Sequence, residues 1–217
     1  MAKTILTAVQ KQILKTLSKD NGFVRNFYLT GGTALSEFYL HHRLSEDLDF
    51  FTETEVDKIW LNTISSIIAK EIKAKKDIQE SFNRNLVFFN SDNQVVKTEF
   101  TYFPMTQIEK PLILNGVPTD SEIDIAVNKF FTIYQKPSAR HFIDLYLLVT
   151  TKNYSWEQLK KLARIKFDTN IDPIQLGSQL VKARDISDLP KMLIKLPDEK
   201  WRKYFLQKAR GLKSELE

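Results

Sequence analysis

Residues 47–50 of the chain, Asp-Leu-Asp-Phe, alternate acidic and apolar side chains, and a second phenylalanine, Phe51, follows. A period of two is typical of a β-strand, so Asp47 and Asp49 project to one side while Leu48 and Phe50 project to the other. Because Leu48 and Phe50 make one side apolar, the pattern predicts a strand over residues 44–51 whose apolar face is buried in a sheet. The fold must therefore contain a packed sheet that carries two neighbouring carboxylates on its other face.

The pair of carboxylates has two interpretations. Adjacent carboxylates repel each other unless a cation neutralises them, and their hard oxygen atoms suit magnesium or manganese. Alternatively, Glu46, Asp47 and Asp49 form the solvated polar face of an edge strand. The pair alone leaves both interpretations open.

Composition narrows the class of protein. The 217 residues are 42% hydrophobic and 27% charged, which is ordinary for a globular chain that forms its own core. Cysteine is absent, which excludes a disulfide framework, a thiolate zinc site and a cysteine nucleophile. With three histidines, a histidine-rich metal site is not expected. Because no apolar run is long enough for a membrane span or a signal peptide, we expect a cytoplasmic protein with no membrane contact.

A glycine turn precedes the acidic strand. The apolar run Phe27-Tyr28-Leu29 predicts a short strand, Gly31-Gly32-Thr33 follows it, and residues 34–42 are predicted to be helical. Glycines let a ligand approach the backbone, and the N–H groups at a helix start favour an anion such as phosphate. A simple turn without a ligand is the alternative interpretation.

The remaining pattern predicts an α+β fold in two domains. Other helices are predicted over residues 4–17, ended by Asn21-Gly22, and over residues 60–74. Strands are predicted over residues 85–90 and 94–103, on either side of a turn at Ser91-Asp92-Asn93. A further strand at residues 112–114 is left open. Helices are predicted over 121–134, 139–149, 155–166, 173–183 and 201–212. We therefore expect a mixed sheet with flanking helices over residues 1–118 and a helical domain over 119–217.

The positive charge of the chain is concentrated in its C-terminal third. Residues 151–217 hold 15 Lys and Arg against 9 Asp and Glu, whereas the totals of 32 and 27 leave 17 against 18 for residues 1–150. A polyanionic partner would explain this excess, and solvated helix faces would explain it equally well.

A third acidic residue, Glu99, lies in the strand predicted over residues 94–103. If it is buried it needs a partner, and Lys97, two positions away on the same face, is one candidate. The alternative is a third carboxylate on a strand beside the acidic strand. Three carboxylates and a glycine turn could hold two divalent metals and a nucleoside triphosphate.

Two segments resemble the opening motif of the AbiEii/AbiGii-type nucleotidyltransferases: Leu29–Leu35, and His42–Phe51 with its His-Arg and Asp-x-Asp. Two more resemble that family's helical motif, Asp124–Lys129 and Arg140–Tyr146. The resemblance covers about residues 27–150. It implies a DNA polymerase beta-like nucleotidyltransferase core followed by a helical region, in a family that includes toxins of bacterial toxin–antitoxin and abortive-infection systems.

The resemblance also implies a role for each matching position. Nucleotide-binding roles fall on Gly31, Gly32, Thr33, Arg43 and Lys129, catalytic roles on Asp47, Asp49, Glu99, Lys129 and Asp144, and metal-binding roles on Asp47, Asp49 and Glu99. The metals would be two Mg²⁺ ions, or Mn²⁺ in their place, and Glu99 would also help to deprotonate the attacking hydroxyl. The chain departs from the family at His141, where an Asp is common.

Some of these positions have structural alternatives. Arg43 could simply pair with Glu46 or Asp47, His42 could be a satisfied surface residue at its helix end, and Lys129 could extend along an apolar helix face to solvent.

The sequence thus predicts a metal-dependent nucleotidyltransferase. An acceptor hydroxyl, on RNA or transfer RNA, would attack the α-phosphorus of a nucleoside triphosphate and release pyrophosphate. The protein would act as the toxin of such a system, with a cognate antitoxin as a partner. Two alternatives stay open: an acceptor on a protein or small molecule, and a nucleotide-binding regulator that has lost catalysis.

Overall fold

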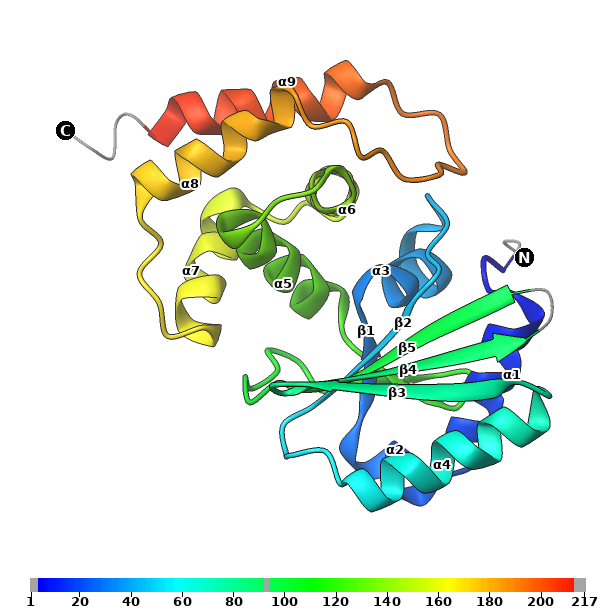
Figure 1. The fold of residues 1–217 in the computed structure, drawn as a ribbon. Coiled ribbons are helices and arrows are strands. Elements are labelled where there is room, and N and C mark those ends of the chain that lie inside the picture. Colours follow the sequence, from blue (N-terminus) through cyan, green and yellow to red (C-terminus); the bar gives the residue numbers. More distant parts are fainter. Residues whose placement is uncertain (1–3, 92–93, 213–217) are drawn as a thin grey trace. The chain divides into compact units, whose positions relative to one another are not determined.

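The computed structural model describes residues 4–91 and 94–212, and the predicted turn at Ser91-Asp92-Asn93 therefore lies partly outside the described residues. The chain divides into two compact units, residues 1–121 and residues 122–217. Unit 1 contains the sheet and unit 2 is helical (Figure 1), which confirms the predicted α+β class.

The described part of unit 1 is built on a seven-stranded mixed sheet in the order β3-β4-β5-β2-β1-β7-β6. The strands are β1 (Tyr28–Thr30), β2 (Leu48–Thr52), β3 (Lys75–Ser81), β4 (Arg84–Ser91), β5 (Gln94–Tyr102), β6 (Leu112–Leu114) and β7 (Val117–Thr119). The β1–β7 and β2–β5 pairs are parallel, and the other neighbouring pairs are antiparallel. The acidic strand β2 is therefore central, and the edge-strand interpretation is wrong.

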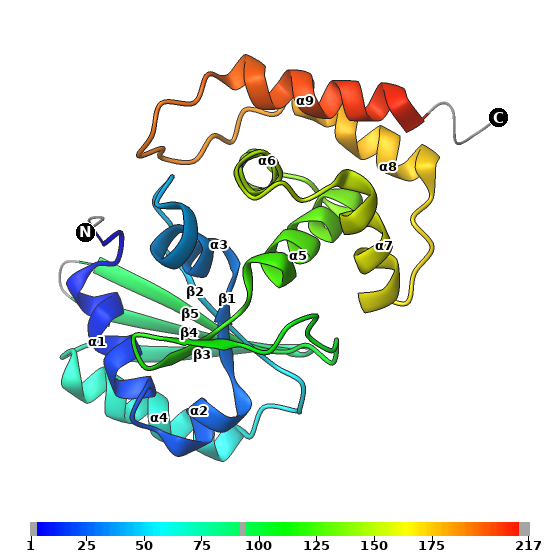
Figure 2. The ribbon, with the colours of Figure 1, turned by 180° about the vertical axis from the view of Figure 1, so that it is seen from behind.

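Helices cover both faces of this sheet (Figure 2). Helices α1 (Ala8–Leu17), α2 (Asn21–Asn26) and α4 (Lys58–Glu71) lie on one face, and α3 (Gly31–Ala34), which continues as the π-helix η1 (Leu35–Leu40), lies on the other. Asn21-Gly22 was expected to end the first helix, but the chain starts α2 there. The carboxylate of Asp20 accepts a hydrogen bond from the Phe23 N–H at 2.7 Å and so caps a new helix.

The alternation in β2 creates one aromatic face. Phe50 pairs in register with Phe100 of β5, and their ring centroids lie 5.0 Å apart. Phe23 of α2 meets Phe50 edge-on at 5.1 Å, and Trp60 of α4 meets Phe100 at 5.8 Å. This face forms the core beneath α1, α2 and α4, so the acidic residues of β2 point to the opposite face, where α3 lies.

The sequence did not predict β3 or β7. Residues 75–81 contain a single apolar side chain, Ile78, and they form a strand because seven consecutive residues pair with β4. The three residues of β7 include Pro118, which discourages a strand assignment, yet they pair with both β1 and β6. The strand at residues 112–114, which the sequence left open, is present as β6.

Unit 2 consists of α5 (Glu122–Gln135), α6 (Ala139–Thr151), α7 (Trp156–Lys166), α8 (Pro173–Leu180), the 3-10 helix η2 (Val181–Arg184) and α9 (Asp198–Gly211). These helices fall where the sequence predicts them. Buried aromatic rings form much of the core: the Phe142 ring lies 4.7 Å from Phe205, and Trp156 meets Phe130 at 4.9 Å. None of the helices in the described part of the chain has the length and apolar character needed to span a bilayer.

Candidate active site

Asp49 lies at the centre of the predicted site. It is in register with Thr30 of β1 on one side and with Glu99 of β5 on the other. Residues paired across neighbouring strands project to the same face, so the two carboxylates share the face away from the aromatic core. Asp47 precedes β2 by one residue, and Lys97, two residues before Glu99 on β5, binds its side chain from that same face. The structure therefore brings the three predicted carboxylates to one region of the sheet.

The position of Asp49 leaves no room for a side chain at Gly31. The backbone of Gly31 has a φ of +75°, and a Cβ at this position would lie 2.6 Å from Oδ2 of Asp49. A side chain here would be strained by the φ angle and would also collide with the carboxylate. Gly31 thus lets the start of α3 lie directly against the acidic strand.

Gly32 makes room for the side chain of Arg43. A Cβ there would overlap the guanidinium of Arg43 and approach Oγ of Ser45 to 2.9 Å. Arg43 is buried and donates from its Nη1 to the carbonyl of Leu44 at 3.0 Å. The glycine pair therefore receives side chains of this chain, in addition to any ligand that approaches its backbone.

The segment before β2 is held by hydrogen bonds to its carbonyl groups. The hydroxyl of Thr33 donates to the Asp47 carbonyl, and Nε2 of Gln10 donates to the Glu46 carbonyl at 2.8 Å. Thr33, predicted to bind nucleotide, thus also fixes the backbone of a predicted catalytic residue. His42 is fully buried rather than a surface residue, and its Nδ1 lies 3.4 Å from Oγ of Ser36.

Two cationic side chains, Lys97 and Arg84, neutralise the carboxylates of Asp47 and Glu99. The Nζ of Lys97 lies 2.7 Å from Oδ2 of Asp47, so Lys97 is bonded to Asp47 rather than to Glu99. Glu99 instead accepts two hydrogen bonds from Arg84 of β4, at 2.7 and 2.6 Å, and one from the Thr101 hydroxyl at 2.8 Å. The partner of Glu99 is therefore a residue that the sequence did not single out.

These contacts fix the ionisation of Glu99. Burial raises the pKa of Glu99, but the hydrogen bonds from Arg84 and Thr101, with the charges of Arg84 and Lys97, outweigh it and hold the pKa below its ordinary value. The hydrogen bonds from Arg84 to Glu99, together with the charges of Glu99 and Asp49, raise the pKa of Arg84 despite its partial burial. Glu99 is therefore an anion and Arg84 a cation at neutral pH.

The fit to divalent metals is partial. No three His, Asp or Glu side chains within residues 4–91 and 94–212 are gathered as a metal-binding group. Asp47 and Asp49 offer oxygen ligands one pleat apart, which suits magnesium. Both oxygens of Glu99 are engaged by Arg84, so this residue would have to exchange a partner before it could bind a metal.

The two predicted site residues of unit 2 bind each other. The Nζ of Lys129 on α5 lies 2.9 Å from Oδ2 of Asp144 on α6, and Asp144 is fully buried. The lysine does not extend into solvent along the helix, because its side chain is 10% exposed. His141 lies one turn before Asp144 on α6.

Asp120 is a buried residue near the glycine turn that the sequence did not indicate. Its carboxylate accepts hydrogen bonds from the Thr30 hydroxyl at 2.7 Å and from Nε2 of Gln107 at 3.0 Å, and its carbonyl accepts one from Tyr39. Asp120 thereby fixes the residue immediately before Gly31. No local pattern connects positions 90 residues apart, whereas Arg84 could have been found by aligning the β4–β5 hairpin on Glu99.

Comparison with known proteins decides the family. A family model described as nucleotidyl transferase AbiEii toxin, type IV toxin–antitoxin system, matches residues 12–215. The chain belongs to the AbiEii nucleotidyltransferase toxin family. This confirms the resemblance seen in its motifs, and the protein is a nucleotidyltransferase.

One sequence relative and two solved structures are similar to this chain. The AbiEii-family chain is 32% identical over 168 residues to an uncharacterized protein of Aquifex aeolicus, an alignment that covers 76% of this chain and 77% of that protein. A candidate nucleotidyltransferase from Helicobacter pylori shares the fold with a TM-score of 0.60 and 20% identity, over 96% of this chain and 93% of that one. JHP933 from Helicobacter pylori gives a TM-score of 0.59 and 19% identity, over 96% and 90%.

Proposed function

We propose that the chain transfers a nucleoside monophosphate from a nucleoside triphosphate to an acceptor hydroxyl, with pyrophosphate as the leaving group. The observation that supports this most is the register that sets Asp49 beside Glu99 and against the Cα of Gly31. In this proposal the triphosphate binds at Gly31, Gly32, Thr33 and Arg43. The family resemblance also implies a phosphate contact from Lys129, whose Nζ lies 2.9 Å from Oδ2 of Asp144.

Magnesium, with manganese as a substitute, is part of the proposal. Asp47 and Asp49 would hold it, and Glu99 would join them only by releasing Arg84. When bound, two such ions would stabilise the attacking and leaving oxygens. Glu99 adds a negative charge beside Asp49 and would take the proton of the attacking hydroxyl.

RNA, including transfer RNA, is the proposed acceptor, and a cognate antitoxin is the proposed protein partner. The positive charge of residues 151–217 supports an RNA acceptor, because lysines and arginines bind phosphates. Membership in a toxin family supports an antitoxin. Neither observation selects the nucleotide base.

The proposal is tested by supplying each of the four nucleoside triphosphates, labelled at the α-phosphorus, with magnesium and one of three acceptors. The acceptors are total RNA, cell protein and small hydroxyl compounds. We expect RNA alone to gain label, with one pyrophosphate released per label, and the D47N/D49N variant to transfer none. Label on protein or on a small compound, and not on RNA, would show that the acceptor belongs to that class instead. Labelling of the acceptor by a parallel γ-labelled triphosphate but not by the α-labelled one, or equal labelling by D47N/D49N, would contradict the proposed chemistry.

A further inference from the structure

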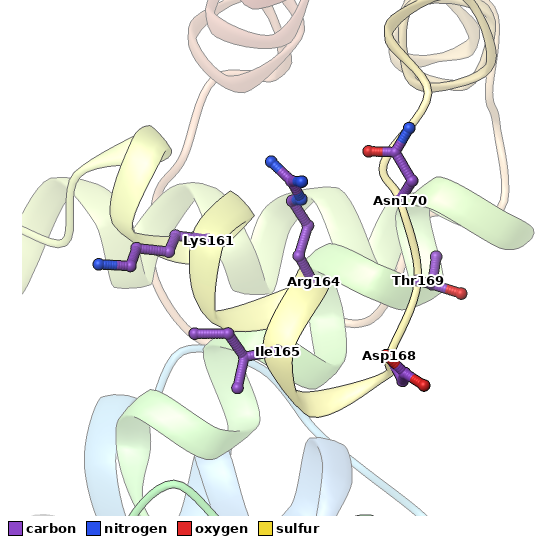
Figure 3. Close-up of a pocket in the computed structure, with 6 residues that line it drawn as sticks. All are labelled: Lys161, Arg164, Ile165, Asp168, Thr169 and Asn170. Carbon is purple, nitrogen blue, oxygen red and sulfur yellow. The ribbon is translucent and has the colours of Figure 1, made fainter.

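An open pocket of about 540 Å³ lies at the end of α7, entirely within unit 2. Its wall is formed by the last turns of α7 and the segment that follows: Lys161, Arg164, Ile165, Asp168, Thr169 and Asn170. In Figure 3 the guanidinium of Arg164 and the amide of Asn170 extend to the same side, from the helix and from the segment after it. A cation and a neutral amide therefore face a common space.

The two cations of this pocket are not bonded to a carboxylate in the described part of the chain, although the carboxylate of Asp168 also lines the pocket. Lys161 and Arg164 are exposed, and neither side chain takes part in an ion pair or hydrogen bond there. Residues three apart on a helix are neighbours, so the two positive charges repel each other. The negative end of the α7 dipole stabilises the charge of Arg164, but Lys161 lies a turn earlier and is stabilised less. An anionic ligand would relieve this repulsion.

The pocket is held in shape from behind. Lys166, on the buried side of α7, lies 2.6 Å from Oδ1 of Asp124 on α5. Phe167 stacks on Phe131 with centroids 3.7 Å apart, and the Thr169 N–H donates to the Arg164 carbonyl at 3.2 Å. The binding groups would therefore need little ordering when a ligand arrives, which favours affinity.

The remaining groups suit a nucleotide better than a simple anion. Ile165, next to Arg164 in the chain, is 68% exposed and offers an apolar surface to a ribose or base. The amide of Asn170 can both donate to and accept from a base edge.

We propose that this pocket binds a single-stranded segment of the RNA acceptor, with Lys161 and Arg164 on phosphates and Ile165 and Asn170 on a nucleoside. This inference rests on the proposed function for the identity of the acceptor. It assigns the contact to residues that are separate from the carboxylates of unit 1.

The test is fluorescence anisotropy of the full chain with a fluorescein-labelled single-stranded RNA of about 12 nucleotides. Loss of two phosphate contacts should lower the slope of log Kd against log salt by about 1.4 and weaken binding at least tenfold near 0.1 M salt for K161Q/R164Q. The matched control is K200Q/K203Q, which removes the same charge at the same spacing from the exposed side of α9. We expect the control to bind like the wild type.

Three outcomes would overturn the inference. These are equal loss in both double variants, no loss in K161Q/R164Q, or equally strong binding of a labelled polyglutamate peptide by the wild type. A nucleotidyl-transfer assay separates this inference from the proposed function. If the inference holds, K161Q/R164Q raises the KM for RNA and leaves kcat unchanged. If the wild type labels RNA but the variant has an unchanged KM, the pocket assignment fails while the transferase stands; if the wild type labels no RNA, the proposed acceptor fails.

Discussion

Two ion pairs, one in unit 1 and one in unit 2, differ in their contact with solvent. In unit 1, the side chains of Lys97 and Asp47 are 29% and 35% exposed. In unit 2, those of Lys166 and Asp124 are 1% and 0% exposed. A solvated pair is worth little and can exchange partners, whereas a buried pair cannot separate without leaving an uncompensated charge. The comparison indicates that Asp47 can exchange its partner, whereas Asp124 has a structural role.

The buried pair gives the largest expected effect on stability. Lys166→Met leaves the Asp124 carboxylate buried without its partner, so the free energy of unfolding should fall by about 3–5 kcal/mol. Urea denaturation followed by tryptophan fluorescence measures this, because Trp156 and Trp201 both belong to unit 2. The matched control is Lys161→Met, an exposed lysine of the same helix, which should change stability by less than about 0.5 kcal/mol. Similar stabilities for the two variants would remove the distinction between the units.

The glycine turn gives the next largest effect. Gly31→Ala forces an alanine into a positive φ and against Oδ2 of Asp49, at a cost of about 1–3 kcal/mol for the backbone alone. We expect nucleotidyl transfer to fall at least tenfold in a steady-state assay, since Asp49 must move. Gly211→Ala is the control, because a Cβ there has no neighbour within 4 Å. Wild-type transfer by Gly31→Ala would show that the contact with Asp49 has no catalytic importance.

Lys97 should compete with a divalent ion for Asp47. Removing the ammonium in Lys97→Met should tighten Mn²⁺ binding a few-fold, as expected from a partly exposed pair worth about 0.2–1 kcal/mol. Titration followed by electron paramagnetic resonance measures this in the absence of nucleotide. Lys75→Met on the edge strand β3 removes the same charge from an exposed position and should leave the affinity unchanged. Weaker binding in Lys97→Met would instead make Lys97 a supporting residue for the metal.

The smallest effect concerns Glu99 and pH. Its folded pKa lies below the ordinary value of 4.5, so its stabilising contribution is present above that value and is lost as the pH falls through the folded pKa. The difference in unfolding free energy between wild type and Glu99→Gln should therefore be largest near neutral pH and shrink in acid. Urea denaturation at a series of pH values measures it. A difference that grows as the pH falls would contradict the assigned contacts with Arg84 and Thr101.

The sequence predicts the parts of the site that depend on local pattern. The period of two in residues 47–50 assigns Asp47 and Asp49 to one face of a strand, and Leu48 and Phe50 predict the buried face. The helices of unit 2 likewise follow from their apolar spacing. These features depend on neighbours a few residues apart, which a sequence displays directly.

Long-range pairing accounts for what the sequence could not predict. Lys97 lies two residues from Glu99, yet strand register places it opposite the residue before β2, and it binds Asp47. Asp120 holds Thr30 across 90 residues, and β3 forms through pairing with β4 despite a polar composition. Each of these three features depends on a partner that is distant in the chain or set by strand register, and local periodicity shows none of them.

The most direct measurement compares the carboxylates of the two units in one assay. Asp49→Asn and Asp124→Asn each remove one charge with almost no change in shape, and transfer is measured per folded molecule beside the melting temperature. We expect Asp49→Asn to lose transfer by about 10³-fold or more, roughly 4 kcal/mol, with little change in melting temperature. Asp124→Asn should lower the melting temperature and retain transfer in its folded fraction. Undiminished transfer by Asp49→Asn would contradict the assignment of chemistry to the sheet.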